Sequence, residues 1–398
     1  MGDNIVMAEF KDLGIQENID YWLWLSLKPG MNASKMEKLM SVFHSPEAIY
    51  NMSEQELLKF RGLDKRTVAA LADKSTQHLS EVKYHCKRFD IYILTYDSPY
   101  YPENLRHISA PPYVLYTRSS KRINLNEYMR ISVVGNRVAT DYGIAAAENF
   151  GYALASNGFV VVSGMALGID GASHRGALKA EGGITVAVLG SGLESAYPKA
   201  HQELMREIMK NGIVISEYPP YSKPEKWHFP ERNRIISGLS QGTLVVEAPK
   251  RSGSLITANY ALEEGRDIFA LPGNIDNTNS EGTNSLIKDG AYLVTSPRDI
   301  VEHYSFEYSE VAKIKETQKQ IQKVKEPKEE IPDEFYIGLT EEEKLIITKL
   351  SGDAKNLEIL QQETKLPADK LASLITMLEI KGKVKSHAGK NFTLNTNR

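Results

Sequence analysis

The pattern of apolar and polar residues changes along the chain, and each pattern predicts a different kind of domain. In residues 18–80 the apolar residues recur at helical spacing, as in SKMEKLMSVF and RTVAALAD. Residues 130–300 instead carry short continuous apolar runs, such as RISVVG, FVVVSG and TLVVEA, separated by stretches of helical length. Because continuous Val, Ile and Leu runs are typical of strands buried on both faces, this alternation predicts a doubly wound, mostly parallel, Rossmann-like α/β sheet.

These patterns divide the chain into four expected parts. We expect an N-terminal helical domain in residues 1–80 and the α/β domain in residues 81–300, which opens with the strand IYILTY and a Pro-rich extended connector. Residues 301–338 are rich in Lys and Glu and contain a single Gly at the end, which predicts a solvated linker. Residues 339–398 show three helical patterns followed by a hairpin around Gly389, the outline of a winged helix.

A short motif occurs twice in the N-terminal domain. Gly30-Met31-Asn32 and Gly62-Leu63-Asp64 are each followed by apolar residues at the same spacing. Gly suits a tight turn between two helices, and Asn or Asp suits the cap of the second one, as in helix-hairpin-helix and SAM-like domains. Such turns can direct backbone amides at a phosphate, but a helical packing domain explains the motif equally simply, and we favour that interpretation.

Composition restricts the class of protein. The 398 residues carry 48 Lys plus Arg against 51 Asp plus Glu, so the net charge of −3 indicates no partner by itself, although a local basic patch remains compatible with it. The single cysteine, Cys86, allows neither an intramolecular disulfide nor a thiolate metal cluster and fits a reducing cytoplasm. The first residues lack the features of a signal peptide, and no apolar run is long enough to span a bilayer, so we expect a cytoplasmic protein without a membrane partner.

Several catalytic and cofactor motifs are missing from the α/β region. The sequence contains no G-x-x-x-x-G-K-[ST], H-E-x-x-H or G-x-S-x-G motif, and the first strand is followed by Gly135-Asn136-Arg137 rather than G-x-G-x-x-G. We therefore expect no catalytic residues, metal ligands or cofactor, and a sheet that binds something phosphorylated through other groups.

Glycine-rich and polar motifs follow the predicted strands. Gly135 and Arg137 lie between a strand and a helix, where a loop can bind an anion, although Arg137 could equally pair with a surface carboxylate. Ser163 and Gly164 begin a second loop of this kind, in SGMALGID. Within that segment we expect Asp170 to cap a helix rather than act as a base.

A basic segment with interleaved aromatic residues follows in KWHFPERNR. Its candidate ligand-binding residues are Lys226, Phe229, Arg232, Asn233 and Arg234. Cations that hold phosphates, beside rings on which bases stack, are suited to a single nucleic-acid strand. The alternative is that the rings pack in the core and the arginines form ion pairs, but we favour binding because so charged a segment is poor core material.

A third loop supplies small residues after a buried strand. Ser252, Gly253 and Ser254 open a helix, and their hydroxyl groups and free amides predict a phosphate cradle. The later LPGN segment is most simply a turn.

Together these motifs resemble those of the DNA-processing protein A (DprA, Smf) family. VVGNR, SGMALGIDGASH, FPERNRIISGLS and SGSLITANYALEEGRDIFALPGN carry the resemblance over about residues 90–300. It implies a non-enzymatic protein that binds single-stranded DNA independently of sequence, forms a homodimer through its Rossmann-like domain and loads the RecA recombinase in natural transformation. The family's DNA contacts correspond to the G-x-R loop, the K-x-x-F segment, the RNR residues and the SGS amides. Leu167 departs from the family, which commonly has Arg there, and Ser173 stands where Ala is usual.

Two other functions remain open. A nucleotide or nucleoside-monophosphate hydrolase could use a related fold, but the P-G-G-x-G-T-x-x-E loop of such enzymes is missing. The winged helix could bind duplex DNA through a basic wing, or its lysines could simply keep a hairpin edge soluble. The wing cations are Lys381, Lys383, Lys385, His387 and Lys390.

Overall fold

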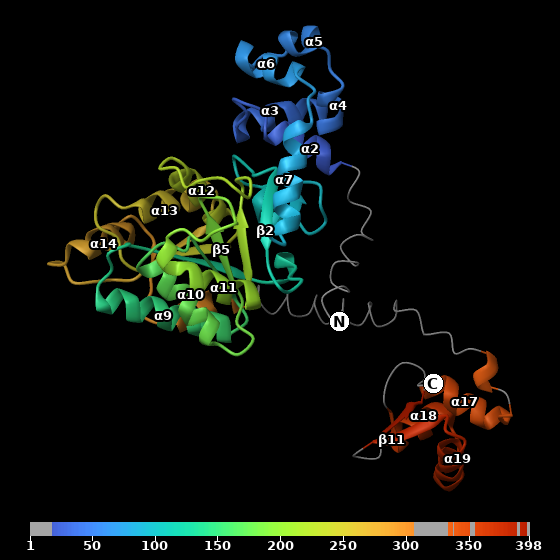
Figure 1. The fold of residues 1–398 in the computed structure, drawn as a ribbon. Coiled ribbons are helices and arrows are strands. Elements are labelled where there is room, and N and C mark those ends of the chain that lie inside the picture. Colours follow the sequence, from blue (N-terminus) through green and yellow to red (C-terminus); the bar gives the residue numbers. More distant parts are fainter. Residues whose placement is uncertain (1–17, 306–332, 337, 351–354, 388–390, 396–398) are drawn as a thin grey trace. The chain divides into compact units, whose positions relative to one another are not determined.

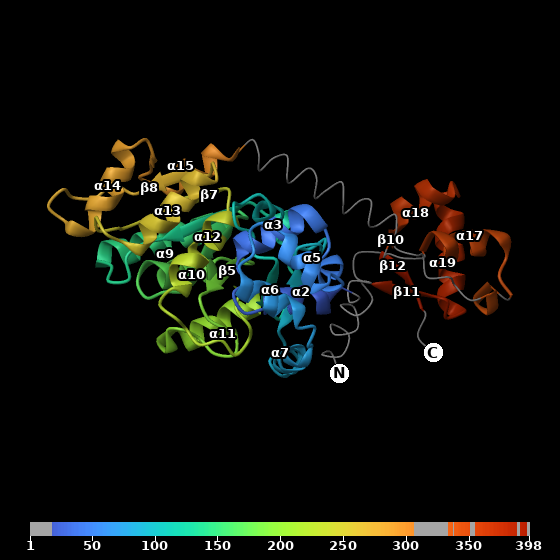
Figure 2. The same ribbon diagram turned by 90° about the horizontal axis from the view of Figure 1, so that it is seen from above.

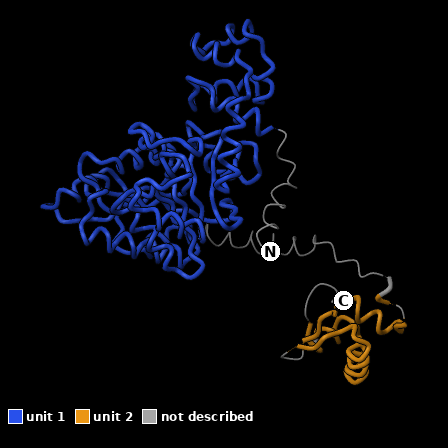
Figure 3. Tube along the Cα trace, viewed as in Figure 1, with its two compact units in different colours: residues 1–313 blue, residues 314–398 orange. Residues whose placement is uncertain are grey.

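A computed structural model describes residues 18–305, 333–336, 338–350, 355–387 and 391–395 of the chain (Figure 1). The chain forms two compact units, residues 1–313 and 314–398, and each unit has its own hydrophobic core (Figure 3). Most of the expected charged linker, and Gly389 and Lys390 of the expected wing, lie outside the described residues.

A nine-stranded sheet forms the centre of the first unit, with the order β1-β2-β6-β5-β4-β3-β7-β8-β9. All pairings from β6 to β9 are parallel, and only β1–β2 and β2–β6 are antiparallel, which confirms the expected mostly parallel sheet. The strands are β1 Tyr92–Thr95, β2 Val114–Arg118, β3 Arg130–Val134, β4 Val160–Ser163, β5 Thr185–Leu189, β6 Ile213–Ser216, β7 Gly242–Val245, β8 Asp267–Ala270 and β9 Tyr292–Leu293. The chain runs outward from β3 to β6 and then returns to β7 on the other side of β3, so the winding reverses between β3 and β7.

Helices cover both faces of this sheet. Successive residues of one strand pack in different core clusters. Val133 packs with α9 and α10, while Val134 packs with α12 and α13. This alternation follows from the two-residue repeat of a strand. The covering helices are α9 Asp141–Ser156, α10 Ile169–Lys179, α11 Gln202–Asn211, α12 His228–Gly238, α13 Gly253–Glu263, α14 Glu281–Lys288 and α15 Pro297–His303.

The N-terminal helices lie at the β1–β2 end of the sheet (Figures 1 and 2). They are α2 Ile19–Ser26, α3 Ala33–Phe43, α4 Pro46–Tyr50, α5 Glu54–Lys59, α6 Lys65–Ala72 and α7 Gln77–Arg88. The fully buried Trp22 stacks on Tyr113, with ring centroids 5.8 Å apart, and shares one core cluster with Val214 of β6. These helices are therefore continuous with the α/β core, and α7 crosses the boundary expected at residue 80.

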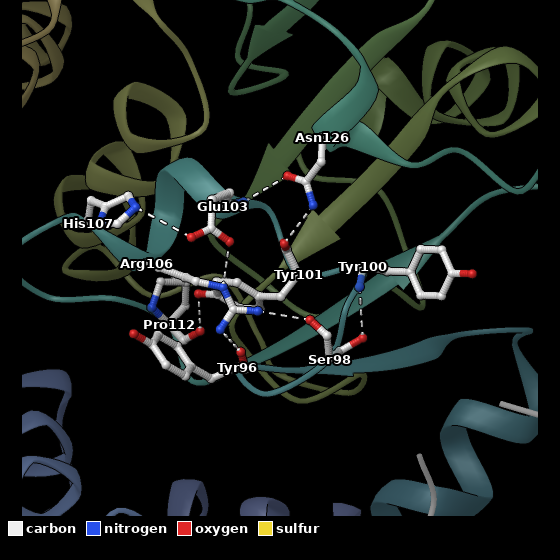
Figure 4. A network of polar contacts seen from close by, with 9 residues as sticks. All are labelled: Tyr96, Ser98, Tyr100, Tyr101, Glu103, Arg106, His107, Pro112 and Asn126. Atoms are coloured by element: carbon white, nitrogen blue, oxygen red, sulfur yellow. Dashed lines mark hydrogen bonds and ion pairs between the residues drawn. The ribbon is translucent and has the colours of Figure 1, made fainter. Parts of the chain in front are cut away.

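The segment between β1 and β2 is held by a polar network around Arg106 (Figure 4). The Arg106 guanidinium donates to the carbonyl oxygens of Tyr96 and Ser98 and pairs with Glu103 at 2.9 Å. The segment also contains the short helix α8 Glu103–Arg106 and leads into β2, two elements that the Pro-rich sequence did not predict. Arg106 thus satisfies two backbone carbonyl groups of this stretch that regular structure does not pair.

The second unit is a winged helix, as expected. Its helices α17 Glu341–Leu350, α18 Leu357–Thr364 and α19 Ala368–Ile380 surround a core that includes Ile346, Leu360 and Ile375. Its small sheet has the order β10-β12-β11, with β10 Lys355–Asn356, β11 Val384–His387 and β12 Asn391–Leu394, and the 3-10 turn η4 Asp333–Tyr336 precedes α17.

Candidate nucleic-acid interface

The candidate residues gather at one edge of the sheet. Because β3 to β8 are parallel, the loops that follow them emerge at the same, carboxyl-terminal edge. All twelve sequence-predicted residues lie between the end of a strand and the early part of the helix that follows it, after β3, β4, β6 or β7, and the β5 loop lies among them. We call this surface the carboxyl edge.

Arg137 and Phe229 meet at the carboxyl edge. The exposed Arg137 guanidinium, from the β3 loop, lies 5.5 Å from the centroid of the Phe229 ring at the start of α12. The Tyr197 ring, from the β5 loop, lies 5.4 Å from Phe229 on another side. A cation and two rings from three loops thus form one accessible cluster, the arrangement that cation–π contact favours.

Arg232 lies beneath this cluster rather than on the surface. Its guanidinium is buried and donates to the carbonyl oxygens of Gly164 and Val188. A Cβ placed on Gly164 would lie 2.9 Å from the Arg232 guanidinium and 2.7 Å from the Asp170 carboxylate, so only glycine fits between them. Burial lowers the pKa of Arg232 to about 10, partly offset by the facing carboxylate of Asp170. Arg232 therefore holds the β4 and β5 ends together.

Asp170 does not cap α10, contrary to the expectation from the sequence. The N-cap is Gly168, and Asp170 is the second residue of the helix, buried beside Arg232 and accepting a hydrogen bond from the Ala166 amide at 3.3 Å. Burial raises the pKa of Asp170, and the charge of Arg232 opposes this rise.

Arg234 and Asn233 connect α12 to its neighbours. Arg234 donates two hydrogen bonds to the Glu217 carboxylate after β6, at 2.5 and 2.7 Å. The Asn233 amide donates to the carbonyl oxygen of Gly253 at 3.1 Å. Both side chains thus position the loops, and they leave Arg137 and Lys226 as the predicted cations that lie exposed at this edge.

At the N-terminus of α13 the predicted phosphate cradle stays a prediction, and the Ser254 amide is already bonded within the protein. Ser252 is the N-cap, and its hydroxyl oxygen accepts from the Ser254 amide at 3.3 Å and contacts the Ser254 hydroxyl at 2.7 Å. Gly253 is exposed, and a Cβ placed there would meet no atom within 4 Å. Glycine at this position therefore leaves the cradle open.

The N-terminus of α9 is filled by a side chain of the protein itself. The buried Glu247 carboxylate, after β7, accepts from the Thr140 amide at 2.9 Å and from the Thr140 hydroxyl. A Cβ on Gly143 would lie 2.5 Å from the same carboxylate. The expectation of a free anion site at this helix end is therefore wrong, because Glu247 occupies it, and Arg137 remains as the donor offered by the β3 loop.

Exposed cations surround this edge on several loops. None of them forms an ion pair within the described residues: Arg137, Lys199, Lys223, Lys226, Lys250 and Arg251. Exposed rings accompany them, because Trp227 is 58% exposed and packs edge-on against His228, which itself stacks on Tyr218. The edge thus combines exposed cations with exposed rings, a combination suited to a single nucleic-acid strand.

Comparison with known proteins identifies the family. Residues 92–305 match the family model described as DNA recombination-mediator protein A, and residues 332–390 match the DprA winged helix domain. The chain belongs to the DNA recombination-mediator protein A (DprA, Smf) family. It is 36% identical over 288 residues to Protein Smf of Synechocystis sp., which covers 71% of each chain. It is 45% identical over 206 residues to the DNA processing protein DprA of Streptococcus pneumoniae, which covers 52% of this chain and 72% of that protein.

The X-ray structure of Streptococcus pneumoniae DprA is also similar in fold. Its TM-score is 0.63 at 35% sequence identity, and the match covers 71% of this chain and 97% of that chain. At the position where the DprA resemblance led us to expect Arg, Leu167 is 46% exposed in the β4 loop.

Two residues of this DprA-family edge escaped the sequence analysis. Glu247 entered only within the run TLVVEA, and Tyr197 was not among the candidate residues. A carboxylate directly after a buried Val-rich strand was the available signal for Glu247, because a buried charge requires partners. No local pattern indicates that Tyr197 meets Phe229, because that contact depends on the sheet order.

Cys86 and the wing cations lie outside the carboxyl edge. Burial raises the pKa of the Cys86 thiol to about 12, and the nearby Glu194 adds to this. In the winged helix, Lys381 pairs at 2.7 Å with the buried Glu343, and Lys383 lies over the Phe335 ring at 4.2 Å. These two wing cations therefore stabilise the unit, and Lys385 and His387 are also exposed.

Searches of the described residues for other kinds of site add two observations. No helix within these ranges is both long and apolar enough to cross a membrane. The same ranges contain no group of three or more His, Cys, Asp or Glu side chains that could hold a metal ion.

Proposed function

We propose that this protein binds single-stranded DNA along the carboxyl edge, independently of base sequence, and passes the strand to a RecA-type recombinase. The observation that carries the proposal is the cluster of the exposed Arg137 and Tyr197 around the half-buried Phe229 ring. Cations can neutralise phosphates while unpaired bases stack on the rings, and stacking does not discriminate strongly between bases. The family description, a DNA recombination mediator, supports the recombinase step.

A binding function also agrees better with the carboxylates of the edge than hydrolysis does. Glu247 is engaged by Thr140, and Asp170 faces Arg232, so both acids have structural partners. A general base must reach a proton on the substrate or its attacking water. We therefore propose a mediator and not a nucleotide hydrolase.

The test is a double variant, Arg137→Ala with Lys226→Ala. Both side chains are exposed and outside any ion pair in the described residues, so their removal leaves the fold intact. We expect weaker binding to every single-stranded sequence, and a salt dependence whose slope falls by about 0.7 for each phosphate that the variant no longer neutralises. Fluorescence anisotropy at several salt concentrations measures both quantities.

A matched control removes two exposed cations that are not among the predicted site residues, Lys87→Ala with Lys288→Ala. It changes the net charge equally and should leave affinity nearly unchanged. Salt-independent binding by the parent protein, or loss of binding for only certain sequences, would contradict the proposal. Recombinase filament assembly on DNA held by each variant tests the second step, and sedimentation tests the homodimer that the family resemblance implies.

A further inference from the structure

The repeated glycine motif forms two related turns in the N-terminal helices. Gly30 precedes α3 with φ of 80°, and 32 residues later Gly62 precedes α6 with φ of 114°. Asn32 and Asp64 are the N-caps, and each side chain accepts from the amide three residues onward at 2.9 Å. The two helix–turn–helix segments are therefore structural repeats.

The repeats pack against each other through their turns. A Cβ on Gly30 would lie 3.2 Å from the Thr67 hydroxyl of α6, and one on Gly62 would lie 3.4 Å from the Lys38 side chain of α3. Lys35 joins the repeats because its ammonium donates to the Gly30 carbonyl, the Asp64 carboxylate and the Thr67 hydroxyl. Both turns consequently lie on one side of this helical module.

Five other cations lie exposed on α3, α5, the second turn and the start of α6. These hairpin cations are exposed and form no ion pair within the described residues: Lys38, Lys59, Arg61, Lys65 and Arg66. The nearest ring, Phe60, is half-buried and packs on Phe43 at 5.5 Å between centroids. The surface thus offers positive charge, and none of its Phe, Tyr or Trp rings in the described residues is exposed.

We propose that the hairpin cations bind the sugar-phosphate backbone of duplex DNA. A patch with cations and no stacking ring suits a ligand whose bases are already stacked and whose phosphates face outward. The carboxyl edge has the opposite character, because Trp227, Tyr197 and Phe229 offer rings to unpaired bases. The proposal stands independently of single-strand binding at that edge.

The helical module is connected to the carboxyl edge within the same compact unit. His85 of α7 pairs with Glu194 after β5, and its ring lies 5.0 Å from the Tyr221 ring after β6. One DNA molecule can therefore place its duplex part at the hairpin cations and a single strand at the carboxyl edge of the same protein. The substrate that uses both surfaces is duplex DNA with a single-stranded tail.

The experiment uses a double variant that carries both Lys65→Ala and Arg66→Ala. It is compared with the parent full-length protein. The ligands are a blunt duplex, a single strand and a duplex with a single-stranded tail, each titrated at several salt concentrations. We expect the variant to bind the blunt duplex about tenfold more weakly and to bind the single strand like the parent. Its salt slope on the duplex should fall by about 0.9 for each phosphate left without a protein cation.

Two further variants separate this proposal from its rivals. The Lys87→Ala with Lys288→Ala control should leave duplex binding unchanged, and Arg137→Ala with Lys226→Ala should weaken the single strand but not the blunt duplex. Equal loss on duplex for the hairpin and control variants would overturn the proposal. So would a parent that binds no duplex, or duplex binding that falls only with Lys385→Ala in the wing.

Discussion

Arg137 and Arg232 both approach the Phe229 ring, at 5.5 and 5.9 Å, yet only Arg137 is available to a ligand. Arg232 is buried and donates to two strand-end carbonyl oxygens, whereas Arg137 is exposed. The two arginines of this cluster thus have different roles: Arg232 supports the structure of the edge, and Arg137 remains available to a ligand. The division follows from burial, because a buried guanidinium must be satisfied by the protein itself.

Burial of a titratable group also makes the stability of the fold depend on pH, and His174 is the example. This ring is fully buried; its Nδ1 lies 2.7 Å from the Thr185 hydroxyl, whose own proton goes to the Val161 carbonyl. Burial lowers the pKa of His174 to about 3, and the neighbouring His201 contributes. The unfolded chain binds this proton near pH 6.5, and the folded chain does not. The contribution of neutral His174 to the free energy of unfolding is therefore complete above that pH. It is lost as the pH falls from 6.5 toward 3, at up to about 1.4 kcal/mol per pH unit.

Urea unfolding as a function of pH checks this prediction. The matched variant is His174→Asn, whose amide can still donate to Thr185 but does not titrate. The difference between the two stability curves isolates the histidine from the carboxylates that titrate in the same range. Parallel curves from pH 6.5 to pH 4 would show that His174 is not the cause.

At the scale of elements, Glu247 ties α9 to the end of β7. Its carboxylate binds the Thr140 amide and hydroxyl, and its own carbonyl oxygen accepts from the Asn136 amide at 2.8 Å. Glu247→Gln retains the volume but loses an acceptor and the charge at the helix N-terminus. We expect this variant to lower the free energy of unfolding by about 1–3 kcal/mol.

Denaturant titration measures that loss, and Glu263→Gln, at an exposed position of α13, is the control that should change stability little. The enzymatic alternative makes a different prediction. The parent protein would hydrolyse nucleoside monophosphates, and Glu247→Gln would lose this activity while keeping the stability of the parent.

Elements were more predictable from the sequence than contacts. Continuous apolar runs predicted the parallel strands, since burial on both faces demands them, and glycine motifs predicted the loops at one edge. The sequence could not show that Arg232 is buried or that Arg234 pairs with Glu217, because both depend on how α12 packs on β5 and on the loop after β6. Nor could it show β2, whose short run in a Pro-rich segment becomes a strand through pairing with β6.

At the scale of the whole molecule, the N-terminal helices and the sheet should unfold together. Trp22 is 2% exposed and belongs to a cluster that reaches Tyr116 of β2 and Val214 of β6, whereas the winged helix has a separate core. Trp22→Ala should therefore destabilise helices and sheet in one transition, by about 3–5 kcal/mol, and leave the winged-helix transition unchanged. Calorimetry resolves these transitions, with the winged helix as an internal control. A sheet transition that keeps its midpoint while the N-terminal helices melt earlier would mean that the shared core does not couple them.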